Sequence, residues 1–344
     1  MKLYDLSYDE LLAYLKSIGQ PAFRAGQILQ WCQKGTAIEG MTNLPQALRE
    51  QLLAMGTGGV VISECHTAKD GSEKYLYTCA DGHAVEGVLM QYRYGGSLCI
   101  STQAGCRMGC AFCASGSKGL ARNLTPGEML GQLYAVIGQH GGERPFNHFV
   151  LMGCGEPLDN YDNVVKFLRL ASQERGLNLS LRNVSLSTCG LVDRMDALAA
   201  ENLPITLCIS LHASDDETRR RIMPIAQKYT VAEVVAAAKR YEQATARRVV
   251  FEYTLIRGVN DSPEAARKLV RLTAHMRKHI NLIPLNGDLH DLRAPSSKEV
   301  ERFYKTLCEM GASVTVRRTL GSDVQGACGQ LRLHKMTDTM GENA

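Results

Sequence analysis

The fold depends on one stretch of the chain, Leu98-Cys99-Ile100-Ser101-Thr102-Gln103-Ala104-Gly105-Cys106-Arg107-Met108-Gly109-Cys110-Ala111-Phe112-Cys113. It opens as an apolar strand and continues into three cysteines at C-x3-C-x2-C spacing, where Gly105 and Gly109 free the backbone to wrap an inorganic core. Thiolates of this kind bind zinc or an iron–sulfur cluster. A structural zinc site needs four protein ligands, and no cysteine or histidine in the loop completes such a set. A four-iron cluster with one open iron is therefore favoured, and zinc is the alternative.

Strands and helices alternate from this stretch onward. Strand-like apolar runs begin near Leu98, His148, Arg182, Pro204, Val249, His279 and Ser313, and helical patterns begin near Thr125, Tyr161, Leu191, Thr230, Ser262 and Ser297. This alternation predicts an α/β fold of parallel strands with right-handed crossovers. A partial (β/α)6 barrel is favoured over a doubly wound nucleotide-binding sheet, because no G-x-G-x-x-G or Walker loop follows a strand. Catalytic groups then belong on the loops after the strands.

The residues before this stretch predict two smaller units. Residues 1–58 read as short helices, with a capping box formed by Ser7 and Glu10. Residues 59–95 alternate between polar and apolar positions and predict a small β-meander. We therefore expect four regions: an N-terminal helical accessory domain (1–58), a β-meander extension (59–95), the partial barrel (96–312), and a C-terminal strand and segment (313–344).

Composition sets broad limits on this protein of 344 residues. Its 22% charged and 45% hydrophobic residues predict a globular protein, and the absence of a long apolar run or a signal-peptide layout predicts a cytoplasmic protein without a membrane segment. The 12 cysteines are too few for a secreted disulfide scaffold. The net charge of +4 permits RNA binding without showing it. We interpret the run Arg219-Arg220-Arg221 as a solvated helix face.

The cysteine loop resembles that of the radical S-adenosylmethionine (SAM) superfamily, in which it follows the first strand of a partial barrel. The resemblance implies that Cys106, Cys110 and Cys113 hold a 4Fe–4S cluster whose open iron binds SAM, and that the reduced cluster cleaves SAM to methionine and a 5′-deoxyadenosyl radical. The run Met152-Gly153-Cys154-Gly155-Glu156-Pro157 resembles the superfamily's Gly-Gly-Glu element. The implied SAM contacts at strand ends are Gly155, Glu156, Ser187, Ser210, Leu211, His212 and Asn286.

Longer motifs resemble the RlmN/Cfr group of RNA adenine methyltransferases over nearly the whole chain. They are the runs at 86–88, 98–106, 155–163 and 327–331, the last being Ala327-Cys328-Gly329-Gln330-Leu331. The resemblance implies that Cys328 takes a methyl group from one SAM and that the radical from a second SAM activates this group to attack the adenine. It further implies that Glu86 removes the ring proton and that Cys99 resolves the RNA adduct by forming a disulfide with Cys328.

The same resemblance implies the substrate and partners. Members of the group methylate C2 of A2503 in 23S ribosomal RNA, and some also act on a tRNA adenine beside the anticodon. We expect a monomer that also needs a low-potential electron donor, such as a flavodoxin, and a thiol reductant. One alternative is methylation at C8, the activity that confers antibiotic resistance. The remaining alternative is a non-catalytic, zinc-structured RNA-binding protein.

Overall fold

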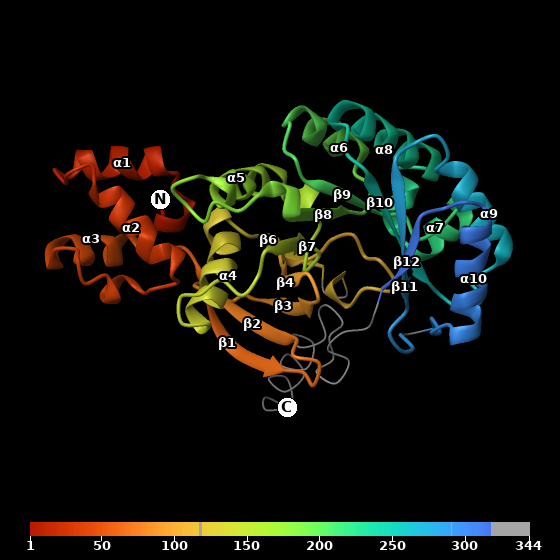
Figure 1. The fold of residues 1–344 in the computed structure, drawn as a ribbon, viewed down its shortest axis with the longest axis horizontal. Helices are drawn as coiled ribbons and strands as arrows, with labels where there is room; N and C mark the ends of the chain where they lie inside the picture. Colours follow the sequence, from red (N-terminus) through yellow and green to blue (C-terminus); the bar gives the residue numbers. More distant parts are fainter. Residues whose placement is uncertain (117–118, 290, 318–344) are drawn as a thin grey trace.

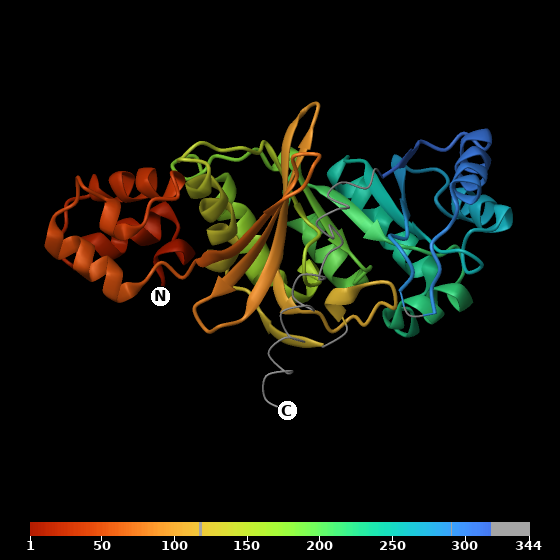
Figure 2. The same ribbon diagram turned by 90° about the horizontal axis from the view of Figure 1, so that it is seen from below.

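Figure 1 shows the computed structural model of the chain, which describes residues 1–116, 119–289 and 291–317. The N-terminal region forms α1 (Tyr8–Ser17), α2 (Arg24–Gln33) and α3 (Gln46–Met55). Ser7 and Glu10 make the predicted capping box, in which each side chain accepts a hydrogen bond from the other residue's backbone N–H. These helices form one end of the molecule, and the sheet separates them from the last helices (Figures 1 and 2).

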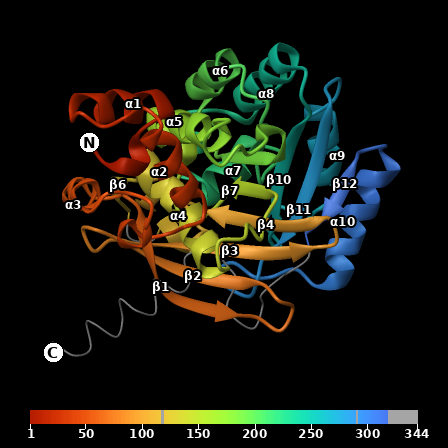
Figure 3. The same cartoon turned by 60° about the vertical axis from the view of Figure 1, so that its left-hand side comes forward.

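The predicted meander consists of β1 (Val60–Thr67), β2 (Glu73–Cys79) and β3 (Ala84–Tyr92), paired antiparallel. It does not stand apart from the barrel. β3 also pairs antiparallel with β4 (Gly95–Ile100), and Figure 3 shows these two strands side by side and pointing in opposite directions. The meander therefore extends the main sheet and places β3 next to the first barrel strand.

The barrel strands are parallel and follow one another across the sheet in chain order, as predicted. After β4 come β7 (His148–Leu151), β8 (Val184–Thr188), β9 (Thr206–Ser210), β10 (Val249–Leu255), β11 (Lys278–Pro284) and β12 (Val314–Val316). The connecting helices are α4 (Pro126–Gln139), α5 (Tyr161–Ser172), α6 (Val192–Ala200), α8 (Val231–Thr245), α9 (Pro263–Leu272) and α10 (Ser297–Glu309). The described residues thus form an open ten-stranded sheet, which confirms the partial barrel.

Short 3-10 helices complete the fold: η1 (Leu3–Asp5), η2 (Ile38–Gly40), η3 (Ala114–Gly116), η4 (Pro157–Asn160), η5 (Leu181–Asn183) and η6 (Pro224–Gln227). In the described ranges no helix combines the length and the apolar character that a membrane crossing requires.

The two faces of the parallel sheet differ in chemistry. Leu98, Leu207 and Phe251 belong to the buried core that packs against the helices. Neighbouring positions point the other way, because side chains alternate along a strand. On this second face, strand pairing sets Ser210 beside Glu252. The sheet therefore has an apolar face toward the helices and a face with polar side chains toward the cavity described below.

A two-stranded ribbon and one helix were not predicted. The strands β5 (Gln103–Gly105) and β6 (Leu120–Asn123) form a separate two-stranded ribbon, and the loop between them carries the three cysteines. The helix α7 (Asp216–Ile222) follows β9. Both elements lie at the carboxyl ends of the barrel strands.

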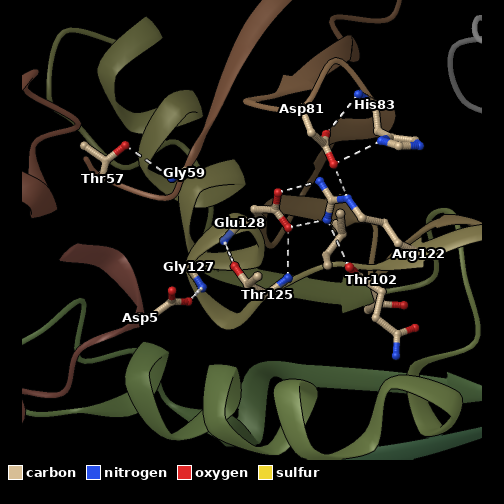
Figure 4. Close-up of polar contacts among 12 residues, drawn as sticks. Asp5, Thr57, Gly59, Asp81, His83, Thr102, Arg122, Thr125, Gly127 and Glu128 are labelled. Carbon is tan, nitrogen blue, oxygen red and sulfur yellow. Dashed lines mark hydrogen bonds and ion pairs between the residues drawn. The ribbon is translucent and has the colours of Figure 1, made fainter. Parts of the chain in front are cut away.

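A cluster of charges anchors the ribbon to the rest of the fold (Figure 4). Arg122 on β6 donates from Nη1 and Nη2 to Glu128 at 2.8 and 2.7 Å, and from Nε to Asp81 in the β2–β3 turn. At the start of α4, the Gly127 N–H donates to Asp5 Oδ1 at 2.7 Å. These contacts connect the N-terminal region, the meander and the ribbon. The two strands between which the cysteine loop runs are therefore held in place.

Candidate active site

The cysteine loop is closed at its base by backbone contacts. The Cys106 N–H donates to the Gly119 carbonyl at 3.0 Å, and the Cys113 N–H donates to the Cys110 carbonyl at 3.0 Å. Gly105 has a φ of +83°, and a Cβ there would lie 2.1 Å from the Gly119 oxygen. Only glycine fits this position, because a side chain would meet both an unfavourable backbone conformation and a clash with backbone.

One cavity of about 420 Å³ collects most of the predicted site residues. Its lining includes Cys99, Cys106, Cys110, Cys113, Gly155, Glu156, Ser187, Ser210, His212 and Asn286. Leu211 is fully buried between two of these residues. Glu86 is buried and does not line the cavity in the described part of the chain. Cys328 lies outside the described residues.

The chemistry of the three thiols fits an iron–sulfur cluster. Burial, with smaller contributions from the charges on Glu156 and Cys113, raises the pKa of Cys106 to about 12. Burial, Cys113 and Cys106 also raise the pKa of Cys110. The thiols are therefore close enough to repel one another as thiolates, a state that a cationic cluster core would stabilise. The described residues hold no three side chains placed to bind a single metal ion, whereas in a four-iron cluster each thiolate binds a different iron.

Glu156 has a fixed position at the wall of the cavity. Its Oε1 accepts a hydrogen bond from the Leu158 N–H at 3.0 Å, and its Oε2 accepts one from the Cys189 N–H at 2.7 Å. Burial raises the pKa of Glu156, and these backbone N–H groups oppose the rise. The Glu156 N–H in turn donates to Gln103 Oε1 at 2.8 Å. Each carboxylate oxygen keeps a lone pair, so the group can also accept from an ammonium in the cavity.

Gly155→Ala is expected to lower the free energy of unfolding by about 2–4 kcal/mol. Gly155 has a φ of +112°, and an added Cβ would lie 2.6 Å from the Cβ of Gln103 and 2.8 Å from its backbone nitrogen. Urea denaturation at unchanged slope measures the loss. The matched control is Gly71→Ala, where φ is +81° but no atom lies within 4 Å, and we expect a loss of only about 1–2 kcal/mol. Equal losses for the two variants would show that the close approach of Gln103 has no energetic consequence.

The ends of β8 and β9 contribute hydroxyl groups and an imidazole. Ser187 Oγ lies 3.3 Å from Ser210 Oγ. His212 Nδ1 accepts a hydrogen bond from the Thr254 N–H at 2.8 Å, and Asn260 Nδ2 donates to the His212 carbonyl at 2.7 Å. Burial, with a smaller contribution from the charge on Arg219, lowers the pKa of His212 to about 3. His212 is therefore neutral at pH 7 and serves as a hydrogen-bonding group rather than a cation.

The buried neutral His212 is expected to make the fold sensitive to acid. Its pKa is about 3 in the folded protein and about 6.5 in the unfolded chain. Below pH 6.5 only the unfolded chain takes up this proton, so the histidine's contribution to stability is complete above pH 6.5 and falls by about 1.4 kcal/mol per pH unit below it.

The variant His212→Asn tests this contribution, because the amide oxygen can still accept the Thr254 N–H while the titration is removed. Urea denaturation from pH 4 to pH 7 should show a weaker pH dependence in the variant than in the parent. Parallel curves would contradict the assignment of a neutral, buried His212.

Glu86 lies on the same sheet face as Cys99, next to the cavity. β3 brings Val88 beside Cys99 on one side and beside Lys74 on the other, and Glu86 points to the same face as Val88. The Glu86 side chain lies 3.8 Å from Lys74 Nζ, and both residues are buried. An edge strand would have exposed this glutamate; because β3 lies inside the sheet, the carboxylate is shielded from solvent.

The structure corrects one interpretation of the sequence and reveals another buried charge. Arg219 is 0% exposed, so the predicted solvated face holds only for Arg220 and Arg221. The helical spacing of Arg219 and Ile222, both of which face inward, is the signal that could have shown this. Glu252 also lines the cavity, and its carboxylate accepts a hydrogen bond from Asn281 Nδ2 at 2.8 Å. No sequence motif marked Glu252.

Comparison with known proteins gives matches over the whole chain. Residues 100–270 match the radical SAM superfamily, and residues 1–56 match the ribosomal RNA large subunit methyltransferase N-terminal domain. The chain is 48% identical over 340 residues to the probable dual-specificity RNA methyltransferase RlmN of Lachnospira eligens, covering 97% of this chain and 96% of that protein. It is 44% identical over 344 residues to the protein of the same name from Clostridium acetobutylicum, covering 99% of each.

The fold is also similar to a solved structure. A radical SAM methyltransferase from Sphaerobacter thermophilus superposes with a TM-score of 0.92 at 40% identity. The superposition covers 96% of this chain and 98% of that one. The similarity therefore extends to the arrangement of the N-terminal region, the meander and the barrel together.

Proposed function

Because this chain belongs to the RlmN family of radical SAM RNA methyltransferases, we propose that it methylates C2 of A2503 in 23S ribosomal RNA through an S-methylcysteine. The names of the relatives include the words dual-specificity, which supports a second RNA substrate. We propose a tRNA adenine beside the anticodon for this role. The observation that carries the proposal is the convergence of the cysteine loop, Glu156 and Cys99 on one cavity.

The cavity provides the groups that SAM and its cluster require. In the proposal, Cys106, Cys110 and Cys113 hold a 4Fe–4S cluster, which when bound supplies the electron that cleaves SAM to a 5′-deoxyadenosyl radical. Glu156 accepts hydrogen bonds from the SAM ammonium, and Gly155 lets the backbone approach it closely. The hydroxyls of Ser187 and Ser210 and the amide of Asn286 bind its remaining polar groups, beside Leu211 and His212.

The cysteine pair and Glu86 act on the RNA. Adenine C2 is electron-poor and does not attack a sulfonium methyl, so a carbon radical must add to it. The Cys328 thiolate attacks the methyl carbon of a first SAM, releases S-adenosylhomocysteine and carries the methyl group as a thioether. This methyl group then loses a hydrogen atom to the 5′-deoxyadenosyl radical, and the resulting carbon radical bonds to C2. The radical adduct passes one electron to an acceptor, a role that the oxidised cluster would supply, and Glu86 accepts the proton from C2. The Cys99 thiolate then attacks the Cys328 sulfur, so the S–S bond forms while the C–S bond breaks and the released carbon takes a proton.

The buried environment of Glu86 supports its proposed role as the base. Burial restricts the movement of the carboxylate and its contact with water. In the proposal it therefore stays within reach of the proton on adenine C2. Lys74 Nζ lies 3.8 Å from the Glu86 carboxylate, and this contact helps to hold the proposed base in position. The pairing of Val88 with Cys99 sets the proposed base and the proposed resolving thiol on neighbouring strands.

SAM carrying a fully deuterated methyl group tests this route. The proposed chemistry removes one deuterium to 5′-deoxyadenosine and adds one solvent proton on release, so the adenine should gain a methyl group with two deuterium atoms and one hydrogen. Mass spectrometry of the product nucleoside measures the label. A methyl group that keeps all three deuterium atoms would indicate direct displacement and would contradict the thioether route. Turnover further needs a low-potential electron donor and a thiol reductant for the disulfide.

A further inference from the structure

Arg219 is a fully buried cation at the cysteine loop. Within residues 1–116, 119–289 and 291–317, its guanidinium donates only to backbone carbonyls: Nε to Leu211 at 3.1 Å, Nη1 to Tyr229 at 3.3 Å, and Nη2 to Cys189 at 2.6 Å and Ser210 at 3.4 Å. Among the residues that the structure describes, no carboxylate forms an ion pair with it, and Asp216 acts on it only through space. Carbonyl dipoles satisfy the donors, and no described carboxylate touches the positive charge directly.

A buried charge of this kind calls for an explanation. Removing an ion from water is costly, and buried charges in proteins are normally paired with an opposite charge. Burial lowers the pKa of Arg219, and the neighbouring Cys189 and Cys110 thiols oppose this as thiolates. Arginine nevertheless stays charged, because its ordinary pKa lies far above neutrality. The missing anion is therefore expected within reach of Arg219.

The helix that carries Arg219 packs against the cysteine loop. The Ala111 N–H donates to the Ile222 carbonyl at the end of α7 at 2.9 Å. Ile222 and Met223 form an apolar cluster with Met108, Cys110 and Phe112 packed against it. Arg219 also acts electrostatically on the Cys110 thiol and favours its thiolate. Both the packing and the electrostatics connect this cation to the cysteine loop.

The other charged residues at the cysteine loop, Arg107 and Glu156, do not supply a buried positive charge as Arg219 does. Arg107 is exposed and forms an ion pair with Asp159 at 2.8 Å, so solvent screens it and a carboxylate balances it. Glu156 is buried and has the opposite sign, and in the proposed function its charge is balanced by the ammonium of SAM. Arg219 is thus left as a buried positive charge acting on a loop of three thiolates.

We propose that Arg219 raises the reduction potential of the cluster held by Cys106, Cys110 and Cys113, and so eases the electron transfer that cleaves SAM. The inference rests on the proposed cluster. Reduction adds a negative charge to a group that its thiolates already make anionic, and a nearby cation in a medium of low dielectric constant favours the more negative state. Arg219 is a positioning residue in this account, because it acts on the cluster without touching the substrate.

A potentiometric titration of the reconstituted full chain, followed by electron paramagnetic resonance of the reduced cluster, tests this. For Arg219→Gln we expect the ratio of reduced to oxidised cluster at a fixed potential to fall about tenfold, which for one electron corresponds to a midpoint about 59 mV lower. Arg219→Lys keeps the charge and should change the ratio by less than about twofold. Arg220→Gln removes an exposed charge from the same helix and should leave the midpoint unchanged.

Asp216→Asn extends the test to a variant expected to fold normally. Asp216 Oδ1 accepts the Val231 N–H at 2.7 Å, and asparagine keeps this acceptor while losing the negative charge that acts on Arg219. The ratio of reduced to oxidised cluster at a fixed potential should then rise by about twofold, because the negative charge of Asp216 no longer offsets the positive charge of Arg219.

The outcomes separate the two proposals. If the reconstituted parent protein carried no iron, the proposed cluster would be overturned. A loaded Arg219→Gln protein with an unchanged midpoint would overturn the role of Arg219, as would equal shifts in the Gln and Lys variants. If Arg219→Gln does not fold, an unchanged or lowered midpoint in Asp216→Asn would overturn it.

Discussion

Cys99→Ala is expected to leave the RNA covalently attached to the protein. Cys99 is buried, lines the cavity, and lies on the same sheet face as Glu86. Without its thiol, the proposed C–S bond between the adenine methylene and Cys328 would have no attacking group to break it. In a single-turnover reaction we expect up to about one RNA bound per chain and a fall in multiple-turnover methylation of at least about 100-fold. Denaturing gel electrophoresis with labelled RNA measures the adduct.

Cys79→Ala is the matched control for this variant. Cys79 is similarly buried in the meander, on β2, at 3% exposure against 4% for Cys99, but it does not line the cavity. It should release product at the rate of the parent and leave no adduct. Normal turnover by Cys99→Ala would show that another thiol resolves the adduct, and the disulfide assigned to Cys99 and Cys328 would be wrong.

Cys110→Ala is expected to abolish both iron binding and SAM cleavage. The cavity brings Cys110 together with Cys106 and Cys113, and two thiolates cannot complete a site with one open iron. Anaerobically prepared parent protein should carry about four irons per chain, and the variant should carry almost none. The rate of 5′-deoxyadenosine formation should fall by at least about 1,000-fold. Iron analysis and chromatography of the nucleoside product give the two measurements.

Cys154→Ala is the matched control for cluster loss. Cys154 is buried near Cys106 and raises the pKa of that thiol. Its backbone contacts, from its N–H to Ser101 Oγ and from the Thr102 N–H to its carbonyl, do not depend on the side chain. The variant should keep its iron. Loss of iron in Cys154→Ala would identify a fourth cysteine ligand and would favour the zinc-type site that the sequence left open.

Local signals in the sequence predicted most of the helices and strands. Thr125 and Glu128 form a capping box at the start of α4, and Pro263 occupies the first turn of α9. Such signals involve residues three or four positions apart, and they act in the same way in any fold. The order of strands in the barrel followed from their alternation with helices, since parallel neighbours need a crossover.

Features that depend on distant parts of the chain were not predicted. The pairing of β3 with β4 makes the meander part of the main sheet, and this pairing carries Glu86 into a buried position. Arg219 belongs to a run of arginines whose composition indicates solvent exposure, yet the docking of α7 against the cysteine loop buries its guanidinium. Burial of this kind is decided by tertiary packing, which a local pattern does not encode.

The position of the added methyl group tests the central claim most directly. We expect 23S ribosomal RNA from a strain that lacks its own enzyme, after reaction with this protein and SAM, to yield 2-methyladenosine at A2503 when its nucleosides are separated and identified by mass spectrometry against synthetic standards. Methylation at C8 alone would assign the chain the alternative activity. An unmodified adenine, under conditions in which the protein cleaves SAM, would contradict the proposed substrate.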